Sequence, residues 1–172
     1  MTENTARSDV QMHSDAMQQF LTFSLGNEEY GIELLKVQEI KGYSPVTPIP
    51  NCPAHVKGVL NLRGAVIPVV DLRVRFGMDA AEYNKFNVII VTNMGSKVVG
   101  LLVDAVSDVL NVGPADVRPA PDFGTHADTR FISGMAACGE KIAVLLELDT
   151  LLVDVEAPHE AETEMAAKPA AN

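Results

Sequence analysis

The chain has 172 residues, 47% of them hydrophobic and none of them tryptophan, and its formal net charge is −10 at pH 7. This length predicts one domain, or two small and closely packed ones, with an aliphatic core, and the negative charge argues against a general nucleic-acid-binding protein. No apolar run approaches the ~18 residues of a membrane-spanning helix, and residues 1–19 lack the apolar segment of a secretory signal, so we expect a cytoplasmic protein.

The two ends of the chain differ in composition from the middle. Residues 1–17 are polar and charged with little periodicity, and residues 156–172 are mostly alanine, glutamate and proline. Segments of this kind bury too little apolar surface to fold, so we predict two flexible tails, the second of them acidic. The structured body should span residues 18–155.

The body begins with a predicted β-hairpin. Residues 20–25 alternate with the period of two that is typical of a strand, residues 26–29 form a turn, and Tyr30 starts the return strand. Residues 34–40 then shift toward helical spacing. Four prolines between positions 45 and 53 indicate an irregular, stiff connection.

A second hairpin follows this connection. Strands are predicted over residues 56–62 and 65–70, joined by a turn at Arg63–Gly64. Pro68 cannot donate a ladder hydrogen bond, which indicates a sheet edge or a bulge. Asp71 should be the N-cap of a short helix.

The second half of the body repeats the first after 69 residues. Gly26 and Gly31 fall on Gly95 and Gly100, within a match of about twenty positions. The predicted elements of the second half are strands over residues 87–94, 97–103, 106–112, 131–137 and 141–147, an irregular segment over 113–129, and a closing helix over 150–153 capped by Asp149. Such self-similarity indicates two related β units.

Each half has roughly the size of a five-stranded SH3-like barrel, and many short strands with glycine and proline turns are typical of barrels and sandwiches. The predicted fold is therefore mainly β, with two SH3-like five-stranded β-barrel subdomains, short helices and an internal duplication. We place subdomain one at about residues 18–80 and subdomain two at about residues 86–150, with the closing helix reaching residue 155.

The sequence lacks the motifs of a catalytic or metal site. It contains no P-loop, no GxGxxG after a strand and no GxSxG elbow. The four histidines are scattered without an HxH or HExxH pattern, and Cys52 and Cys138 are predicted to be free thiols. We therefore predict a protein that is not an enzyme and that needs no metal or cofactor.

The second hairpin and the helix after it carry unusual charge. Lys57, Arg63, Arg73 and Arg75 against Asp71 give this region a local charge of +3 on an acidic body. One interpretation is a solvated loop with basic ends. The other is an arginine that contacts a partner, because guanidinium binds carboxylates bidentately and anchors many interfaces.

The body resembles the CheW family of bacterial chemotaxis coupling proteins from about residue 19 to residue 153. The segments that carry the resemblance are FLTFSLG (20–26), EYGI (29–32), VQEI (37–40), PAHVKGV (53–59), NLRG (61–64), PVVDL (68–72), VD (103–104), RPAP (118–121) and FISG (131–134). The resemblance implies two SH3-like barrels packed on a shared core. It also implies a non-catalytic scaffold that joins the CheA histidine kinase, through its regulatory domain, to the cytoplasmic tips of methyl-accepting chemotaxis receptors in membrane-associated arrays.

The resemblance also implies sites. Carried over by motif, the receptor-binding candidates are Val37, Glu39, Lys57, Gly58, Arg63 and Val88, and the kinase-binding candidates are Arg118 and Phe123. We expect Glu39 and Arg63 to lie close together at the rim of a groove between the barrels. Strand or turn packing is the alternative interpretation for each candidate, and core packing for Val37 and Val88 in particular.

Three other functions fit parts of the pattern. A coupling domain fused to a phospho-receiver would need a further unit of ~120 residues, and a kinase fragment would need ATP-binding glycine motifs. The main alternative is a small-ligand-binding β-barrel protein, which would show ligand-dependent thermal shifts without binding a kinase.

Overall fold

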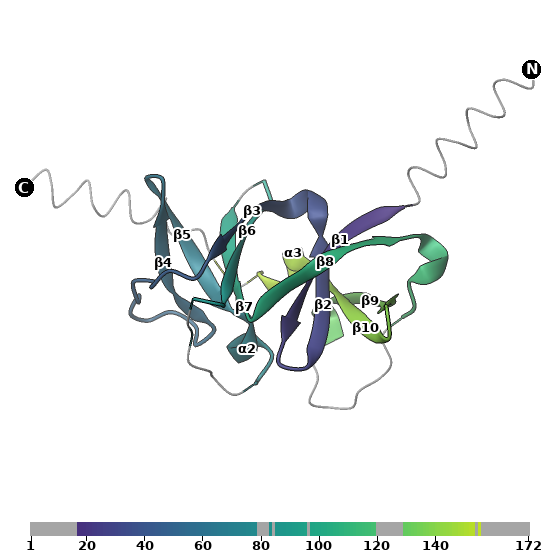
Figure 1. Cartoon of the computed structure of the whole chain (residues 1–172). Coiled ribbons are helices and arrows are strands. Elements are labelled where there is room, and N and C mark those ends of the chain that lie inside the picture. The colour runs from purple at the N-terminus through teal and green to yellow at the C-terminus, as the bar shows by residue number, and fades with distance from the viewer. Residues whose placement is uncertain are drawn as a thin grey trace, which may run out of the picture.

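The computed structural model describes residues 17–78, 83, 85–95, 97–119, 129–153 and 155. Within these residues ten strands form two five-stranded sheets, so the predicted mainly β fold of two SH3-like five-stranded units is confirmed (Figure 1). The tails predicted at residues 1–17 and 156–172 lie outside the described residues, apart from Met17.

The elements follow one another in a similar order in both halves of the chain. The strands are β1 (Gln18–Leu25), β2 (Glu28–Glu33), β3 (Val37–Gly42), β4 (Val56–Leu62), β5 (Ala65–Asp71), β6 (Val88–Asn93), β7 (Val98–Val103), β8 (Ala105–Val112), β9 (Ile132–Cys138) and β10 (Lys141–Leu146). The α-helices are α2 (Leu72–Arg75) and α3 (Leu148–Leu151), and the 3-10 helices are η1 (Leu34–Lys36), η2 (Pro114–Asp116) and η3 (Thr129–Phe131).

Each sheet combines strands from both halves of the chain. The order is β8-β1-β2-β10-β9 in one sheet, which we call the first barrel, and β3-β6-β7-β5-β4 in the other, the second barrel. In each barrel, the first two strands of one half pair with the last three strands of the other half. This pairing corrects the expectation that residues 18–80 and 86–150 would each form a barrel of their own.

The exchange of strands begins at η1. This 3-10 helix directly follows β2 and turns the chain out of the first barrel, so that β3 pairs with β6. At the equivalent place in the second half, Asp104 separates β7 from β8, and β8 pairs with β1. The duplication itself cannot predict this exchange, because exchanged and unexchanged pairings bury the same repeated apolar pattern.

Three local expectations differ from the structure. The helical spacing over residues 34–40 is a 3-10 turn followed by β3, whose alternate residues are half-buried and which pairs with β6. Pro68 lies in an interior strand, but the ladder between β5 and β7 starts at Val69, so the missing N–H of Pro68 breaks no bond in it. Glu147 is the N-cap of α3, and Asp149 lies in the first turn of that helix.

The core consists of one cluster between the two sheets and a smaller cluster inside each barrel. The shared cluster includes Phe23 and Ile32 of the first barrel, Leu101 of the second, and Leu72 and Leu151 of the two short helices. Burial of each such side chain contributes about 1.5–3 kcal/mol relative to its exposure. This shared cluster holds the two barrels against each other.

Candidate functional site

Glu39 and Arg63 lie close together, as expected, and form an ion pair on the second barrel. Arg63 Nη1 donates to Glu39 Oε1 at 3.4 Å, and Arg63 Nη2 donates to Glu39 Oε2. The Arg63 side chain is 67% exposed and the Glu39 side chain 27% exposed. The hydrogen bonds from Arg63 hold the pKa of Glu39 below its ordinary value.

The position of Arg63 follows from the turn between β4 and β5. Arg63 and Gly64 both have positive φ angles, +53° and +90°. Two consecutive residues of this kind are typical of the tight turn that matches the twist of a two-residue hairpin. The Asn61 side chain supports the turn, since its Oδ1 accepts from Gly64 N at 2.9 Å. The hairpin therefore presents Arg63 at its tip.

The ion pair joins the two edges of the second barrel. Glu39 lies on β3 and Arg63 follows β4, and these are the outermost strands of the sheet. A pair of backbone hydrogen bonds, 2.9 and 2.8 Å long, also joins Val59 of β4 to Thr47, which lies in the connection between β3 and β4. An exposed ion pair adds little to stability because water screens it. The main effect of the contact is therefore to orient the Arg63 guanidinium, and its contribution to the free energy of folding is small.

Gly58 is buried beneath the segment that contains Thr47. Its φ angle is +156°, and a Cβ atom at this position would lie 2.2 Å from the carbonyl oxygen of Thr47. Gly134 has a similar place in the first barrel, where a Cβ would lie 2.5 Å from Val117 Cγ1. Glycine is thus required here by the close approach of two backbone segments. Backbone packing is thus sufficient to explain why residue 58 is a glycine.

Lys57 lies near the start of β4, at the far end of that strand from Arg63. Its Nζ atom is 4.6 Å from the centre of the Tyr83 ring, and the Tyr83 ring lies 5.8 Å from that of Tyr43. Desolvation by burial and a hydrogen bond to Asp71 raise the pKa of Tyr83 above its ordinary value. The Lys57 ammonium therefore lies over one ring of a pair of tyrosines.

Val37 and Val88 are half-buried at opposite ends of the ladder between β3 and β6. Val37 pairs with Thr92, whereas Val88 pairs with Gly42. Both valines pack against the core cluster shared by the two barrels. The structure therefore does not bring these two candidates together, and each contributes to packing.

Of the two kinase-side candidates, the structure describes Arg118, which lies beside the first barrel. Arg118 is exposed and its backbone forms a bridge to Met135 of the edge strand β9, with hydrogen bonds of 2.8 and 2.7 Å. Phe123 lies outside the described residues. Arg118 is thus on the first barrel, whereas the Glu39–Arg63 pair is on the second.

The basic cluster expected from the sequence is dispersed in the structure. Arg63 contacts Glu39 and Lys57 lies over Tyr83, while Arg73 pairs with Asp104. Arg75 lies over the Phe131 ring, 5.2 Å from its centre, and its Nε donates to Leu151 O at 3.4 Å. Since these four cations point to different partners, they do not form one basic surface.

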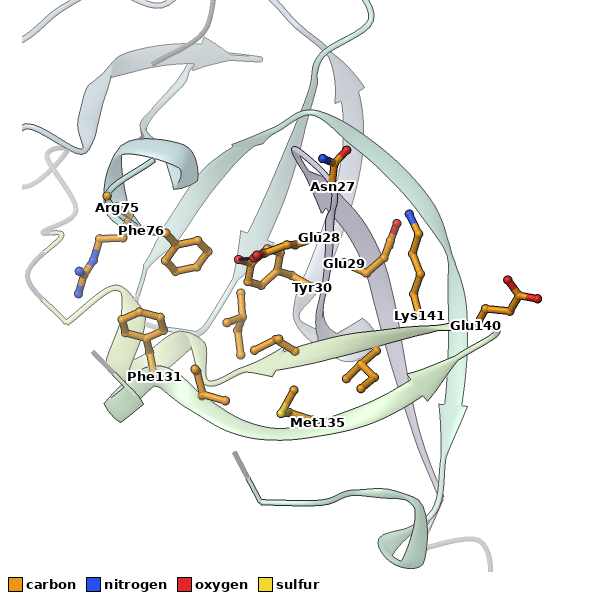
Figure 2. A pocket seen from close by; sticks show the side chains of 15 residues that line it. Asn27, Glu28, Glu29, Tyr30, Arg75, Phe76, Phe131, Met135, Glu140 and Lys141 are labelled. Atoms are coloured by element: carbon orange, nitrogen blue, oxygen red, sulfur yellow. Dashed lines mark hydrogen bonds between the residues drawn. The ribbon is translucent and has the colours of Figure 1, made fainter. Parts of the chain in front are cut away.

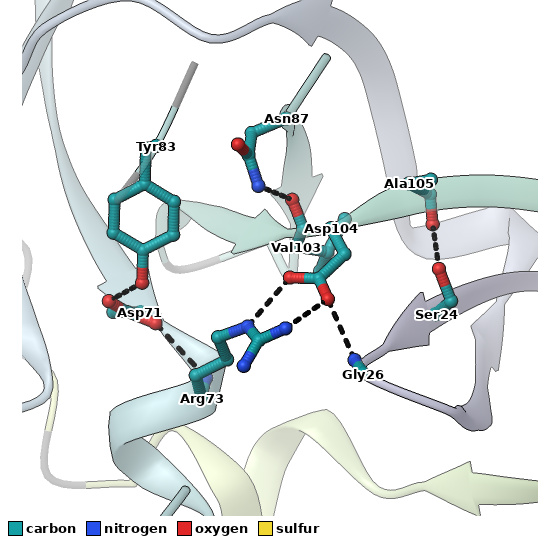
Figure 3. Close-up of polar contacts among 9 residues, drawn as sticks. All are labelled: Ser24, Gly26, Asp71, Arg73, Tyr83, Asn87, Val103, Asp104 and Ala105. Atoms are coloured by element: carbon teal, nitrogen blue, oxygen red, sulfur yellow. Dashed lines mark hydrogen bonds and ion pairs between the residues drawn. The ribbon is translucent and has the colours of Figure 1, made fainter. Parts of the chain in front are cut away.

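A polar network between the barrels was not predicted from the sequence. Asp71 caps α2 as expected, accepting from Arg73 N at 3.0 Å, and it also accepts from the Tyr83 hydroxyl (Figure 3). Asp104 accepts from Arg73 Nε at 2.8 Å, from Arg73 Nη2 at 2.5 Å and from Gly26 N at 2.7 Å. The sequence does contain one indication of this network, because the charged residue Asp104 alone separates two predicted strands.

Cys52 and Cys138 are both free thiols, as predicted, and Cys52 Sγ donates to Ile49 O at 3.0 Å. In the part of the chain that the structure describes, every helix is too short or too polar to cross a membrane.

Comparison with known proteins identifies relatives of the whole body. Residues 19–156 match the family model of the CheW-like domain. The chemotaxis protein CheW of Klebsiella aerogenes is 49% identical over 139 residues, which cover 81% of this chain and 84% of that protein. The chemotaxis protein CheW of Rhizobium meliloti is 44% identical over 138 residues, covering 80% and 89% of the two chains.

A solved structure agrees with these sequence matches. The crystal structure of the scaffolding protein TtCheW from Thermoanaerobacter tengcongensis superposes with a TM-score of 0.71 and 34% identity, covering 78% of this chain and 87% of that one. The family model spans most of this chain, and the two sequence relatives cover 81% and 80% of it. The chain therefore belongs to the CheW-like domain family.

Proposed function

We propose that this protein is a non-catalytic scaffold of bacterial chemotaxis that couples the CheA histidine kinase to methyl-accepting chemotaxis receptors. The observation that carries the proposal is the bidentate contact of Glu39 with Arg63, whose side chain is 67% exposed at the tip of the hairpin between β4 and β5. The relatives named above as chemotaxis and scaffolding proteins support the same function.

The geometry of this pair suits a partner contact. Glu39 orients the Arg63 guanidinium, and the 67% exposed side chain keeps further N–H donors free for a carboxylate or carbonyl of the partner. A receptor tip is a helical hairpin that can place an apolar side chain between the barrels while the rim charges fix its orientation. Val37, which is half-buried and close to Glu39 on β3, would border that contact. Val88 and Lys57 would extend it toward the other ends of β3 and β4, and Gly58 would act indirectly by holding the Thr47 segment against β4.

A scaffold also needs a second surface that remains accessible while the first is occupied. Arg118 is exposed on the first barrel, so a kinase contact through Arg118 and Phe123 would leave the second barrel accessible to receptors. In this proposal the protein works in the cytoplasm and is recruited to receptor arrays at the membrane. It neither inserts into the membrane nor turns over a substrate.

Two charge reversals test this division of labour. We expect Arg63→Glu to lose binding to vesicles that carry receptor cytoplasmic domains and to retain binding to the regulatory domain of CheA. Arg118→Glu should show the opposite pattern. Lys85→Glu is the matched control, because Lys85 is exposed and belongs to neither proposed surface. Loss of both interactions in either variant, with the fold intact, would contradict the proposal of two separate surfaces.

A further inference from the structure

The first barrel carries a cleft that none of the proposed contacts uses. The cleft has a volume of about 800 Å³ and lies between β2, β9, β10 and the end of α2 (Figure 2). Arg75 and Phe131 lie at one end of it and Glu140 and Lys141 at the other, with Tyr30 and Phe76 between them.

The floor of the cleft is an apolar strand face. Val144 of β10 lies in register between Tyr30 of β2 and Met135 of β9, and Ile142 on the same face of β10 is 58% exposed. The opposite face of β10, which includes Leu145, is buried inside the barrel. A strand that is apolar on both faces is typical of sheets that are covered on both sides. The composition of β10 therefore indicates that another segment packs on the floor of the cleft.

The internal duplication shows what covers the equivalent place on the second barrel. Pro68 and Val70 of β5 correspond to Val144 and Leu146 of β10, and both are buried. The chain that follows α3 is held there by Lys97, whose Nζ donates to Leu152 O at 2.5 Å and to Val155 O at 2.8 Å. Val155 is 2% exposed and belongs to the same core cluster as Val70. The apolar residues Leu152 and Val155 therefore lie at this position on the second barrel.

The charge at the rim of the cleft is the reverse of that at the equivalent place. Glu28 corresponds to Lys97 in the duplication. Glu28 is exposed at the rim, and its Oε2 accepts from the Tyr30 hydroxyl at 2.6 Å. Glu29 and Glu140 add two further carboxylates, so that the three glutamates outnumber Lys141 at this end of the cleft, while Arg75 at the other end is engaged with Phe131 and Leu151 O. On the second barrel, the Lys97 ammonium donates to backbone carbonyl oxygens of the covering segment. At the equivalent place on the first barrel, carboxylates could instead accept hydrogen bonds from a cationic side chain of the occupant.

We propose that this cleft docks a peptide segment of a partner protein that carries two or three large apolar side chains followed by basic residues. The apolar side chains would lie on Ile142, Val144 and Met135, and the basic residues would reach Glu28 and Glu140. This site is a third interaction surface. It does not depend on the proposed contacts of Arg63 or Arg118.

The test is a titration of the full chain, labelled at its Met and Ile methyl groups, with the peptide Ac-Leu-Phe-Leu-Lys-Lys-NH2. We expect saturable NMR shifts at Met135 and Ile142, and none at Ile40, which is 47% exposed on β3 of the other barrel. Replacing both lysines of the peptide by glutamates should weaken binding about tenfold, since each exposed ion pair contributes up to ~1 kcal/mol. Equal affinities of the two peptides, or no shift with the lysine peptide, would overturn the proposal.

Variants keep the test specific to the cleft. Ile142→Gln should abolish saturable binding without unfolding the protein, because Ile142 is already 58% exposed, and Ile40→Gln should leave binding unchanged. Glu28→Gln should weaken the lysine peptide and leave the glutamate peptide unaffected. Full affinity of Ile142→Gln for the lysine peptide would contradict the site.

Two other occupants are distinguishable in the same experiment. If the neutral dye Nile red binds saturably at Met135 and the lysine peptide does not displace it, the cleft is a site for small apolar ligands and the peptide proposal fails. If removal of residues 156–172 shifts the Met135 and Ile142 signals before any peptide is added and strengthens peptide binding, the occupant is the chain's own C-terminal segment, and the proposal of a partner segment fails as well.

Discussion

Arg73 of α2 donates two hydrogen bonds to the carboxylate of Asp104, 31 residues further along the chain (Figure 3). The same carboxylate accepts from the backbone of Gly26, in the turn between β1 and β2. One half-buried side chain thus connects the short helix after β5, the link between β7 and β8, and the first hairpin. Because these elements belong to different barrels, this contact fixes the orientation of one barrel against the other.

Removal of the Asp104 charge should destabilise the protein. Asp104→Asn keeps the shape of the side chain but loses the charge that accepts from Arg73, and leaves the half-buried guanidinium poorly paired. We expect the free energy of unfolding to fall by about 1–3 kcal/mol, measured by urea denaturation. Asp149→Asn is the control, because Asp149 is 70% exposed and should change stability little. Equal effects of the two substitutions would argue against this role of Asp104.

The same contact should make stability depend on pH. Burial alone would raise the pKa of Asp104, but the hydrogen bonds from Arg73 and Gly26 outweigh it and hold the pKa below its ordinary value. A carboxyl group with a lowered pKa in the folded state contributes stability that is present above its unfolded pKa, about 3.9, and is lost as the pH falls through its folded pKa. The difference in unfolding free energy between wild type and Asp104→Asn should therefore be constant near neutral pH and shrink below about pH 4. A difference that is unchanged at pH 3 would contradict this account.

Gly58 should tolerate no side chain. In Gly58→Ala the new methyl group would meet the Thr47 carbonyl oxygen, 2.2 Å away, at a φ of +156°. We expect a loss of about 2–4 kcal/mol in the free energy of unfolding, because two backbone segments would have to separate. Gly42→Ala is the matched control, since no atom lies within 4 Å of a Cβ at Gly42. A stable Gly58→Ala variant that fails to bind receptors would instead assign Gly58 a direct contact.

Charge reversal at Arg63 should spare the fold. The pair with Glu39 is exposed and screened by water, so Arg63→Glu should leave Tm nearly unchanged while receptor binding is lost. Differential scanning calorimetry of wild type and variant measures this directly. A large fall in Tm would mean that the pair mainly closes the edge of the second barrel, and the loss of binding would then have a structural cause.

The exchange of strands predicts how fragments behave. Each barrel needs β1 and β2 from one half with β8, β9 and β10 from the other, or the converse set. Fragments 1–84 and 85–172 should therefore lack native sheet structure when separate and regain it when mixed. Circular dichroism and gel filtration of the separate and mixed fragments test this. Two independently folded fragments would contradict the exchanged topology.

Much of the fold could be predicted because its signals are local. The period-two pattern and turn residues placed β4 correctly over Val56–Leu62, and the N-cap signal placed Asp71 correctly at the start of α2. The partners of each strand could not be predicted in this way, because a duplicated pattern fits either half equally well. Asp149 was chosen as a cap on residue type, whereas the backbone geometry makes Glu147 the N-cap.

In the candidate site, too, some contacts could be predicted from the sequence and others could not. The contact between Glu39 and Arg63 was expected and is confirmed. The separation of Val37 from Val88 depends on the register of β3 against β6, which no local signal specifies. The sequence does contain a signal for the cleft on the first barrel, since residues 141–146 lack the polar alternation of a strand with one solvated face.

The central claim is that the Glu39–Arg63 pair serves a partner rather than the fold, and autophosphorylation of CheA with receptor-containing membranes tests it most directly. Wild type should stimulate phosphorylation, whereas Arg63→Glu should not. The exchanged pair Glu39→Arg/Arg63→Glu should restore the contact between the two side chains and still fail to stimulate the kinase. Full stimulation by the exchanged pair would show that the two residues merely hold the barrel edges together, and equal phosphorylation with and without wild-type protein would contradict the coupling function itself.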